Sequence, residues 1–366
     1  MPTCPQCRRA LPDDFKVCPY DAADLGGVAT GTNTPRDDAS SAARTPAERA
    51  MIVGLQDRFE VKRRLGQGGM ATVFHAVERS AGMDVAIKVM SNAHARSTPE
   101  RQRFMREAEM ILPLRHPNIM NVYAFGELKD GSPYIVMQYL EGESLGAVFR
   151  RGDPIDRTFA LRVASEAAAG LAAAHAEGIV HRDVKSDNIF IVGSPERIRG
   201  IKVLDFGLAR LSGASGLTAK GMIVGTPEYM APEQTVNEAT DARTDIYGLG
   251  VVFYRLLTGA LPFPLHNEIE LLAAHFAIRP PPLSSRGVDA HEAVERVLMG
   301  ALRKVPSNRY PSMGDFGEDL ERLRLERYEE VSGPTAVCDD VYVPKAPFAQ
   351  SIARILTKKA GGLAFA

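Results

Sequence analysis

The chain has 366 residues, of which 45% are hydrophobic and 24% are charged, and its formal net charge at pH 7 is −1. This composition is typical of a soluble globular protein with a buried core, and the length suggests about two structural units. Because the net charge is close to zero, the composition does not support a nucleic-acid partner, which would need a strongly basic surface.

The start of the chain and its apolar segments argue against a membrane-spanning protein and against a secreted one. No run of apolar residues is long enough to span a bilayer. The first residues, Met-Pro-Thr-Cys, lack the basic and then apolar pattern of a secretory signal. We therefore expect a cytoplasmic protein with no membrane span in this chain.

Three of the four cysteines lie within the first 18 residues, in two related turns. Cys4-Pro-Gln-Cys7 is followed by Cys18-Pro-Tyr-Asp21, so Asp21 stands where a repeat would place another cysteine. Two such turns supply four ligands to one Zn²⁺, and residues 1–24 resemble a zinc ribbon with a structural or partner-binding role. The alternatives are a disordered leader and a redox pair, but a redox pair would need a βαβ setting that is absent here.

Two further segments differ in composition from the body of the chain. Residues 25–56 are mostly small and polar, which predicts a flexible linker, with order resuming near Phe59. Residues 57–328 form the main domain. Residues 329–366 contain Pro, Gly and Ser with little periodicity, which predicts a disordered tail.

The pattern within the main domain changes from strands to helices. An early helix begins with Thr98 as N-cap and Pro99 as its first helical residue, and it ends at Pro113. A later apolar helix is stopped by Thr-Gly. We predict an α+β protein with a small β-rich lobe and a larger helical lobe. The expected strands are 59–65, 72–77, 85–89 and 133–140, and the expected helices are 98–112, 161–175, 246–257 and 293–302.

A glycine-rich turn joins the first two expected strands. Its sequence is Gly66-Gln67-Gly68-Gly69-Met-Ala-Thr-Val73. Glycines allow the backbone to approach a phosphate closely, although an ordinary hairpin turn has the same composition. β-forming residues follow, so a dinucleotide-binding turn, which needs a helix there, is excluded. A Walker loop is also excluded, because Gly-Lys-Ser/Thr is absent.

Lys88 lies inside the apolar strand 85–89, where a charged side chain is unusual unless it has a partner or a function. It either faces solvent or binds nucleotide phosphates while a helix carboxylate holds it in place. Glu107 fits that carboxylate, because it follows Phe104 by three residues on the inward side of the helix. Glu109 is the alternative and points elsewhere.

The most informative stretch is His181-Arg182-Asp183-Val-Lys185-Ser-Asp-Asn188, followed by Asp205-Phe-Gly. It combines one carboxylate that can orient a hydroxyl with oxygen ligands for Mg²⁺ and a cation. Each of these residue types is common in turns, but the ordered set predicts phosphoryl transfer from a metal–nucleotide complex.

From about residue 59 to residue 327 the chain resembles the protein kinase family, in particular bacterial kinases of the eukaryotic-like Ser/Thr type. The resemblance implies a bilobal kinase fold over 57–328, with ATP and Mg²⁺ as cofactors and proteins as substrates. It implies that Asp183 is the base, that Lys185 contacts the transferred phosphate, and that Asn188 and Asp205 bind Mg²⁺. Lys88 and Glu107 would complete the catalytic set. The nucleotide would lie against Leu65, Gly66, Gln67, Gly68, Gly69, Val73 and Lys88, with the backbone of Met137, Gln138, Tyr139 and Leu140 reading the adenine.

Further matches concern the segment that follows Asp205. Residues 225–233, Gly-Thr-Pro-Glu-Tyr-Met-Ala-Pro-Glu, resemble the end of an activation segment. Lys185 and Thr226 resemble the Ser/Thr-type pattern, and Thr226 is expected to hydrogen-bond Asp183 and Lys185. Asp245 resembles the anchor of the catalytic loop, and Arg309 the buried partner of Glu233. The sequence departs from the family at Ala71, where the third glycine is usual, which affects the expected nucleotide affinity and not the chemistry.

The same resemblance suggests regulation by phosphorylation. Arg182 and Arg210 would clamp a phosphate on the activation loop, with Thr218 preferred and Ser212 or Ser215 as alternatives. Otherwise the two arginines pair only with local acids. A second functional hypothesis is a pseudokinase scaffold that recruits partners through its N-terminal module. Scaffolds usually lose the base, the metal Asp or the ATP lysine, and all three are present here.

Overall fold

The computed structural model describes residues 45–334 except 96, 195–196, 207–215, 218–222, 225 and 265–266, and also residues 342, 350, 353–355 and 357–358. It separates into two compact units. Unit 1 comprises Met1–His116 and Met120–Glu141, and unit 2 comprises Pro117–Ile119 and Gly142–Ala366. None of the helices in the described part of the chain has the length and hydropathy needed to cross a membrane.

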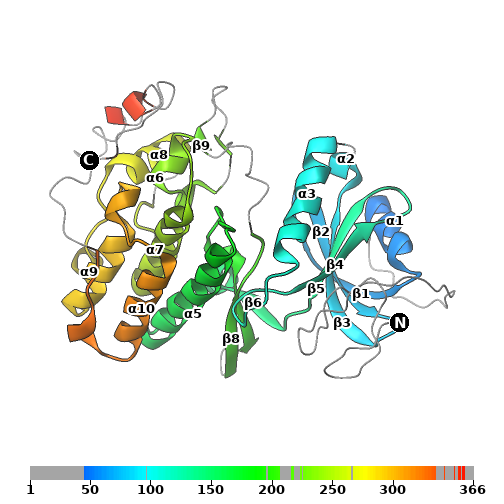
Figure 1. Ribbon diagram of the computed structural model, residues 1–366, viewed down its shortest axis with the longest axis horizontal. Helices are drawn as coiled ribbons and strands as arrows, with labels where there is room; N and C mark the ends of the chain where they lie inside the picture. Colours follow the sequence, from blue (N-terminus) through cyan, green and yellow to red (C-terminus); the bar gives the residue numbers. More distant parts are fainter. Residues whose placement is uncertain are drawn as a thin grey trace. The chain divides into compact units, whose positions relative to one another are not determined.

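Unit 1 is built on a five-stranded sheet in the order β1-β2-β3-β5-β4, in which all neighbours are antiparallel (Figure 1). The expected strands are confirmed, and β4 is an addition that sequence reasoning missed. The elements of this unit are α1 (Pro46–Leu55), β1 (Phe59–Gln67), β2 (Ala71–Glu78), β3 (Met83–Met90), α2 (Asn92–Ala95), α3 (Thr98–Ile111), β4 (Val122–Glu127) and β5 (Pro133–Gln138).

The two faces of this sheet are covered by different helices. Side chains alternate between the faces along each strand, and β2 shows a strict alternation of buried and half-buried residues. Ile87 and its neighbours on one face pack with α1, and α3 packs against β4 and β5. The central strand β3 is therefore buried almost throughout, and Lys88 is one of its few residues that remain partly accessible.

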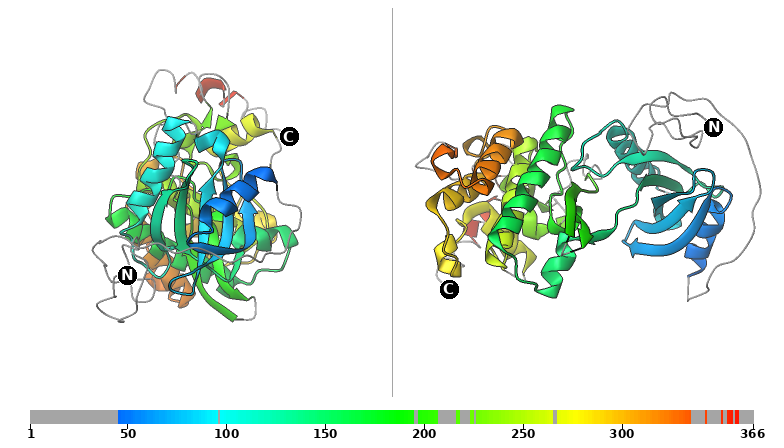
Figure 2. Two further views of the ribbon diagram at one scale, coloured as in Figure 1. Left: turned by 90° about the vertical axis from the view of Figure 1, so that its right-hand side faces the viewer. Right: turned by 90° about the horizontal axis from the view of Figure 1, so that it is seen from below.

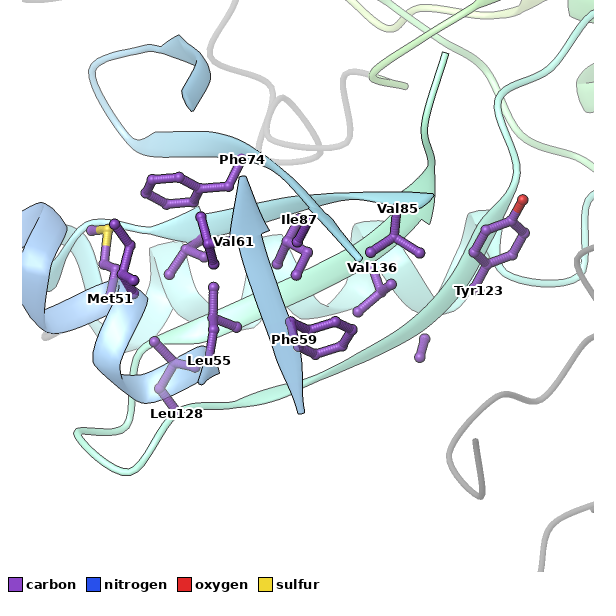
Figure 3. Close-up of a cluster of buried hydrophobic side chains, with 14 of the residues drawn as sticks. Met51, Leu55, Phe59, Val61, Phe74, Val85, Ile87, Tyr123, Leu128 and Val136 are labelled. Atoms are coloured by element: carbon purple, nitrogen blue, oxygen red, sulfur yellow. The ribbon is translucent and has the colours of Figure 1, made fainter. Parts of the chain in front are cut away.

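The prediction of a flexible linker over residues 25–56 is wrong for residues 46–55, which form helix α1 (Figure 2, dark blue). Thr45 and Glu48 form a capping box at its start. Met51 and Leu55 are buried in the same cluster as Phe59 (Figure 3). The capping signature Thr-x-x-Glu before apolar residues was visible in the sequence and predicts a helix start. Met51, Ile52 and Leu55 are buried by α1, whereas Val53 on the same helix is exposed.

Helix α3 confirms the predicted amphipathic pattern, since Phe104, Ala108 and Ile111 are its buried residues. The expected N-cap is wrong by one residue. Ser97 is the N-cap, without a side-chain cap bond, and Thr98 already lies in the helix. The helix ends before Pro113, as expected for a residue that cannot continue it.

Unit 2 is mainly helical and confirms the three predicted helices. Helix α7 is buried on almost every side, with α5 and α9 packed against it. Its C-cap is Gly259, whose φ of 73° is the left-handed conformation that glycine adopts without strain. The helices are α4 (Leu145–Arg151), α5 (Arg157–Ala176), α6 (Pro232–Thr235), α7 (Ala242–Thr258), α8 (Glu268–Ala277), α9 (Glu292–Ala301) and α10 (Met313–Arg324).

Short antiparallel strands complete unit 2. A three-stranded sheet has the order β6-β7-β8, and a two-stranded ladder pairs β9 with β10. The strands are β6 (Gly142–Ser144), β7 (Ile189–Ser194), β8 (Arg197–Val203), β9 (Gly216–Leu217) and β10 (Ile223–Val224). Strands β7 and β8 connect the residues around Asp183 to Asp205, so this sheet links the two segments that carry the expected site residues.

The expectation of a disordered tail over 329–366 is wrong for several residues. Val331 and Ala353 are buried. Tyr342 packs edge-on against Phe276 of α8, and its hydroxyl donates to Glu238. These contacts use apolar side chains scattered without periodicity, so local pattern does not reveal them.

Candidate active site

Asp245, at the start of α7, organises the turn that carries Asp183. Its fully buried carboxylate accepts hydrogen bonds from the backbone N–H of His181 (2.8 Å) and of Arg182 (2.7 Å). A third contact, at 2.7 Å, joins it to Nε2 of His175 on α5. The expectation that Asp245 anchors this loop is confirmed, and His175 is an additional partner that no sequence motif signalled.

Two non-glycine residues of this region have left-handed backbones, namely Arg182 (φ 62°) and Asp205 (φ 38°). Such conformations are costly for residues with a Cβ and persist where the surroundings hold them in place. At Arg182 the restraint comes from both sides, because Asp245 binds its N–H and the Gln234 side chain donates to its carbonyl oxygen (2.9 Å). The strain lies beside the residues expected to perform the chemistry.

His181 connects this turn to the segment around Asp205. Its Nδ1 lies 3.2 Å from the backbone N–H of Asp183, and its Nε2 lies 2.9 Å from the carbonyl oxygen of Leu204. An acceptor at Nδ1 and a donor at Nε2 describe a neutral imidazole. The buried ring also packs against Phe206, with centroids 4.7 Å apart. Sequence reasoning assigned His181 no role, and its position beside Asp183 was the available signal.

The side chains of Asp183, Lys185 and Thr226 form a chain of contacts. The Lys185 ammonium lies 2.9 Å from Asp183 Oδ2 and donates to Thr226 Oγ1 at 2.9 Å. The predicted contact between Lys185 and Thr226 is confirmed, and the predicted bond from Thr226 to Asp183 stays a prediction. One cation thus bridges the expected base and the segment that follows the activation loop.

The expected metal ligands Asn188 and Asp205 lie on connected segments of unit 2. The Asn188 side chain donates through Nδ2 to the Asp183 carbonyl oxygen (2.9 Å) and to Asp183 Oδ2 (3.3 Å), which leaves its amide oxygen as the ligand atom. The backbone N–H of Leu204, next to Asp205, donates to the Asn188 carbonyl oxygen (2.8 Å). An amide oxygen with a nearby carboxylate is a donor set that suits Mg²⁺.

Glu233 and Arg309 form a buried ion pair 76 residues apart in the chain. Two parallel hydrogen bonds of 2.9 and 2.8 Å join them, and Thr244 also donates to Glu233 (2.8 Å). Burial alone would raise the pKa of Glu233, but the Arg309 guanidinium holds that pKa below its usual range. The predicted pairing is confirmed, and it fixes the end of the segment 225–233 to α7 and to the loop before α10.

In unit 1 the predicted pair of Lys88 and Glu107 is confirmed, with Nζ and Oε1 4.0 Å apart. Both side chains are mostly buried, at 19% and 13% exposure. Glu109 is exposed on α3, so the choice between the two acids follows the buried face of the helix. A cation shielded in this way is suited to bind phosphate oxygens.

The glycine turn between β1 and β2 is closed by one backbone bond, from Gly68 N–H to the Ala71 carbonyl oxygen (2.9 Å). A Cβ added at Gly66 or Gly69 would meet nothing within 4 Å, and none of the turn glycines has positive φ. The packing of the chain itself therefore does not demand glycine here. The open backbone fits the close approach of a phosphate group.

The residues expected to surround a nucleotide base differ in exposure. Leu65 is exposed, Val73 is half-buried, and Met137 is buried within β5. The backbone N–H of Gln138 already donates to the Asn121 carbonyl oxygen (2.9 Å). The Gln138 N–H was one of the backbone groups of residues 137–140 expected to bind adenine. In this structure it is hydrogen-bonded within unit 1 instead. Leu140 is half-buried just beyond β5.

Several predicted site residues lie outside the described residues. These are the zinc candidates Cys4, Cys7, Cys18 and Asp21 and the activation-loop residues Arg210, Ser212, Ser215 and Thr218. Within the described ranges, no cluster of three or more His, Cys, Asp or Glu side chains has a metal-binding arrangement. Asp187 is exposed, as expected, and pairs with Arg150 at 2.8 Å.

Comparison with known proteins gives matches over most of the chain. The family model described as protein kinase domain matches residues 59–313. Serine/threonine-protein kinase Pkn1 of Myxococcus xanthus is 41% identical over 327 residues, covering 87% of this chain and 46% of that protein. Serine/threonine-protein kinase PknB of Mycolicibacterium smegmatis is 37% identical over 290 residues, covering 78% and 45%.

A solved structure agrees with these sequence matches. The crystal structure of the Mycobacterium tuberculosis PknI kinase domain aligns with a TM-score of 0.56 and 29% identity, covering 72% of this chain and 95% of that domain. The chain spans about half the length of the curated relatives it matches. Helix α1 and the cysteine turns lie outside the residues matched by the family model.

Proposed function

The chain belongs to the protein kinase family, and we propose that it transfers the γ-phosphate of ATP to serine or threonine hydroxyls of proteins, in bacterial signalling. The contact chain of Asp183, Lys185 and Thr226 carries the proposal. It brings a carboxylate, a cation and a hydroxyl together beside two oxygen ligands for Mg²⁺. A protein that used this fold only as a scaffold would not need that set of groups.

The residues of unit 2 have distinct roles in this proposal. Asp183 orients the substrate hydroxyl and accepts its proton, and its position is fixed by the Asp245 and His181 contacts to the loop backbone. Lys185 places positive charge beside Asp183, where charge develops on the transferred group. Asn188 and Asp205 would hold Mg²⁺, which supplies neutralisation of phosphate charge when bound.

Unit 1 supplies nucleotide binding in the same proposal. Lys88, held by Glu107, binds phosphate oxygens, and the open backbone of the glycine turn donates N–H groups to them. Leu65 and Val73 offer apolar contact to the base. The charges and donors needed for phosphates thus come from β1, β2, β3 and α3.

The test is transfer of labelled γ-phosphate to a generic protein by the full chain. Asp183→Asn should lower the rate by about 10²–10⁴-fold, which is the typical contribution of a positioned general base. Asp187→Asn is the matched control, because Asp187 is an exposed carboxylate of the same loop, and it should leave the rate unchanged. A rate unaffected by Asp183→Asn, or no transfer by the unaltered chain, would favour the scaffold.

We further propose that phosphorylation of Thr218 switches the enzyme on through Arg182 and Arg210. The support is the position of Arg182 directly before the base, with its backbone held in a strained conformation. A phosphate that pairs with both guanidiniums would order the segment after Asp205. Thr218→Ala should lower both the autophosphorylation of this segment, measured by mass spectrometry, and the rate. Unchanged values for this variant, compared with Ser212→Ala and Ser215→Ala, would contradict the switch.

The cysteine turns support a separate proposal, namely a structural Zn²⁺ bound by Cys4, Cys7, Cys18 and Asp21, in a module that binds a protein partner. The repeat of Cys-Pro-x-Cys and Cys-Pro-x-Asp is the observation that favours it. Metal analysis of the full chain should find about one zinc per chain, lost in Cys4→Ser and retained in Cys338→Ser. Protein that was purified in the presence of excess Zn²⁺ and contains no bound zinc would contradict the proposal.

A further inference from the structure

Helix α1 is joined to the kinase domain by a polar contact as well as by its apolar side. On the apolar side, Met51 and Leu55 pack against the sheet (Figure 3). On the polar side, Glu48 contacts Arg64 of β1. Because β1 leads into the glycine turn, Arg64 is only two residues before the first of the glycines expected to bind phosphates.

The carboxylate of Glu48 is buried, at 4% exposure, and both of its oxygens are engaged. Oε2 accepts from the Thr45 backbone N–H at 2.9 Å, which completes the capping box. Oε1 accepts from Nη1 of Arg64. The Thr45 N–H, followed by Arg64, holds the pKa of Glu48 below its usual range, so this helix presents a fixed negative charge to β1 at neutral pH.

Arg64 extends the connection into the glycine turn itself. The same Nη1 donates to Oε1 of Gln67 at 3.1 Å. Gln67 stands between Gly66 and Gly68, so its side chain belongs to the turn expected to bind phosphates. One guanidinium thus joins a buried carboxylate of α1 to the middle of the glycine sequence.

Besides Arg64, the second half of β1 is held by its ladder to β2 and by an exposed bond from Arg63 to the Tyr139 hydroxyl (3.2 Å). After Val61 every residue of the strand is exposed, so the apolar core does not position residues 62–67. The ladder to β2 is irregular at two places, between Val61 and Arg63 and again between Arg64 and Gly66. A strand with bulges and no buried side chains is bent easily, and a contact from a fixed helix restrains it.

We propose that Glu48 and Arg64 are positioning residues for nucleotide binding, and that α1 sets the affinity for ATP by holding the glycine turn through Gln67. The inference rests on the proposed kinase function. The alternative is that the contact only stabilises α1 on the sheet, in which case ATP binding does not depend on it.

The test compares the KM for ATP with kcat for the full chain. Glu48→Gln and Arg64→Ala should each raise KM about threefold to fivefold, a modest factor because the Arg64 guanidinium is half exposed. Both variants should keep kcat within about twofold, since uniform binding affects KM alone. The double variant should add little to either single change, because both interrupt the same contact chain. Arg64→Lys, which keeps a cation near Glu48 and Gln67, should recover part of the change in KM.

Two controls separate positioning from stability. Thr45→Ala weakens the start of α1 without removing the Arg64 contact, and Lys62→Ala removes an exposed pair with Glu60 on the same strand. Neither should change KM. A KM that rises as much in Thr45→Ala as in Glu48→Gln, or that stays constant in Glu48→Gln, would overturn the inference.

A binding measurement distinguishes this failure from failure of the proposed function. The dissociation constant for ATP is measured in the Asp183→Asn background, with and without Glu48→Gln. Weaker binding on adding Glu48→Gln supports the inference whether or not transfer is observed. Equal binding overturns the inference alone, and absence of ATP binding by the unaltered chain overturns both proposals.

Discussion

The turn that carries Asp183 in unit 2 and the glycine turn in unit 1 are held in different ways. Beneath the first turn, the buried carboxylate of Asp245 and the ring of His181 bind the backbone directly. The glycine turn has exposed residues, one bond that closes it and one from Ser91 N–H to the Met70 carbonyl oxygen, and Gln67 is held from α1 through Arg64. The residues expected to act in proton transfer are therefore held by buried polar groups, whereas the turn expected to bind phosphates is held by exposed residues and backbone bonds.

This difference matches the chemistry expected of each region. A group that moves a proton must stay in one geometry, and a misplacement of about 1 Å is enough to lose much of the rate. A loop that admits and releases a nucleotide must open, and elements that move come from the less stable parts of a structure. The predictions below test this contrast, from the largest expected effect on free energy to the smallest.

The largest effect is expected at the buried ion pair of unit 2. Arg309→Met should lower the free energy of unfolding by about 3–5 kcal/mol, because it leaves the Glu233 carboxylate buried without its partner. Denaturant unfolding measures the loss, and the double variant with Glu233→Gln should recover part of it. Arg296→Gln, at an exposed pair with Glu292, is the control and should cost less than about 1 kcal/mol.

The next effect concerns Asp245, which anchors the turn that carries Asp183. Asp245→Asn should lower kcat by about 10²-fold, equivalent to about 2.7 kcal/mol, because the N–H groups of His181 and Arg182 lose a charged acceptor and the loop shifts. Single-turnover kinetics at saturating ATP measures this change. Asp241→Asn is the matched control, because Asn caps α7 as well as Asp does. An unchanged kcat in Asp245→Asn would break the proposed contrast between the two turns.

A third effect is the loss of stability in acid caused by His275. Burial lowers the pKa of His275, and the nearby Lys304 ammonium lowers it further. The pKa is about 3 in the folded protein, compared with 6.5 in the unfolded chain. The folded state therefore binds this proton less readily. The stability from the neutral ring is present above about pH 6.5 and is lost as the pH falls toward 3, by about 2 kcal/mol between pH 7 and pH 5.

Chemical unfolding at several pH values checks this expectation. His275→Asn retains a polar group near the Tyr247 hydroxyl and should flatten the slope between pH 7 and pH 5. His291→Asn, at the exposed start of α9, should leave the slope as it is. Equal slopes in the unaltered protein and in His275→Asn would show that another group dominates acid unfolding.

The smallest effect of the four is expected in unit 1. Glu107→Gln should lower kcat/KM for ATP about tenfold, or about 1.4 kcal/mol, because Lys88 loses the charge that holds it. Glu109→Gln, on the exposed side of the same helix, should leave kcat/KM unchanged. Steady-state kinetics with varied ATP measures both, and equal effects of the two changes would contradict the assignment of Glu107.

Sequence reasoning succeeded where a feature depends on a single helix or strand. The buried face of α3 follows from the spacing of Phe104, Ala108 and Ile111, and that face identified Glu107 in preference to Glu109. It failed at residues 46–55, where composition suggested a linker although Thr45 and Glu48 carried a capping signature. A few apolar residues in a polar stretch are enough to fold when a sheet is available to cover them.

By itself, the sequence determined the order of the strands and helices and the local set of Asp183, Lys185 and Asn188, because these depend on periodicity and on short spacing. Only the tertiary structure decided which distant groups hold that set. The roles of His175 and His181, the contact of Tyr342 with α8, and the path from Glu48 to Gln67 join residues that no local pattern connects. The physical reason is that burial and hydrogen-bond geometry depend on the packing of whole elements against one another.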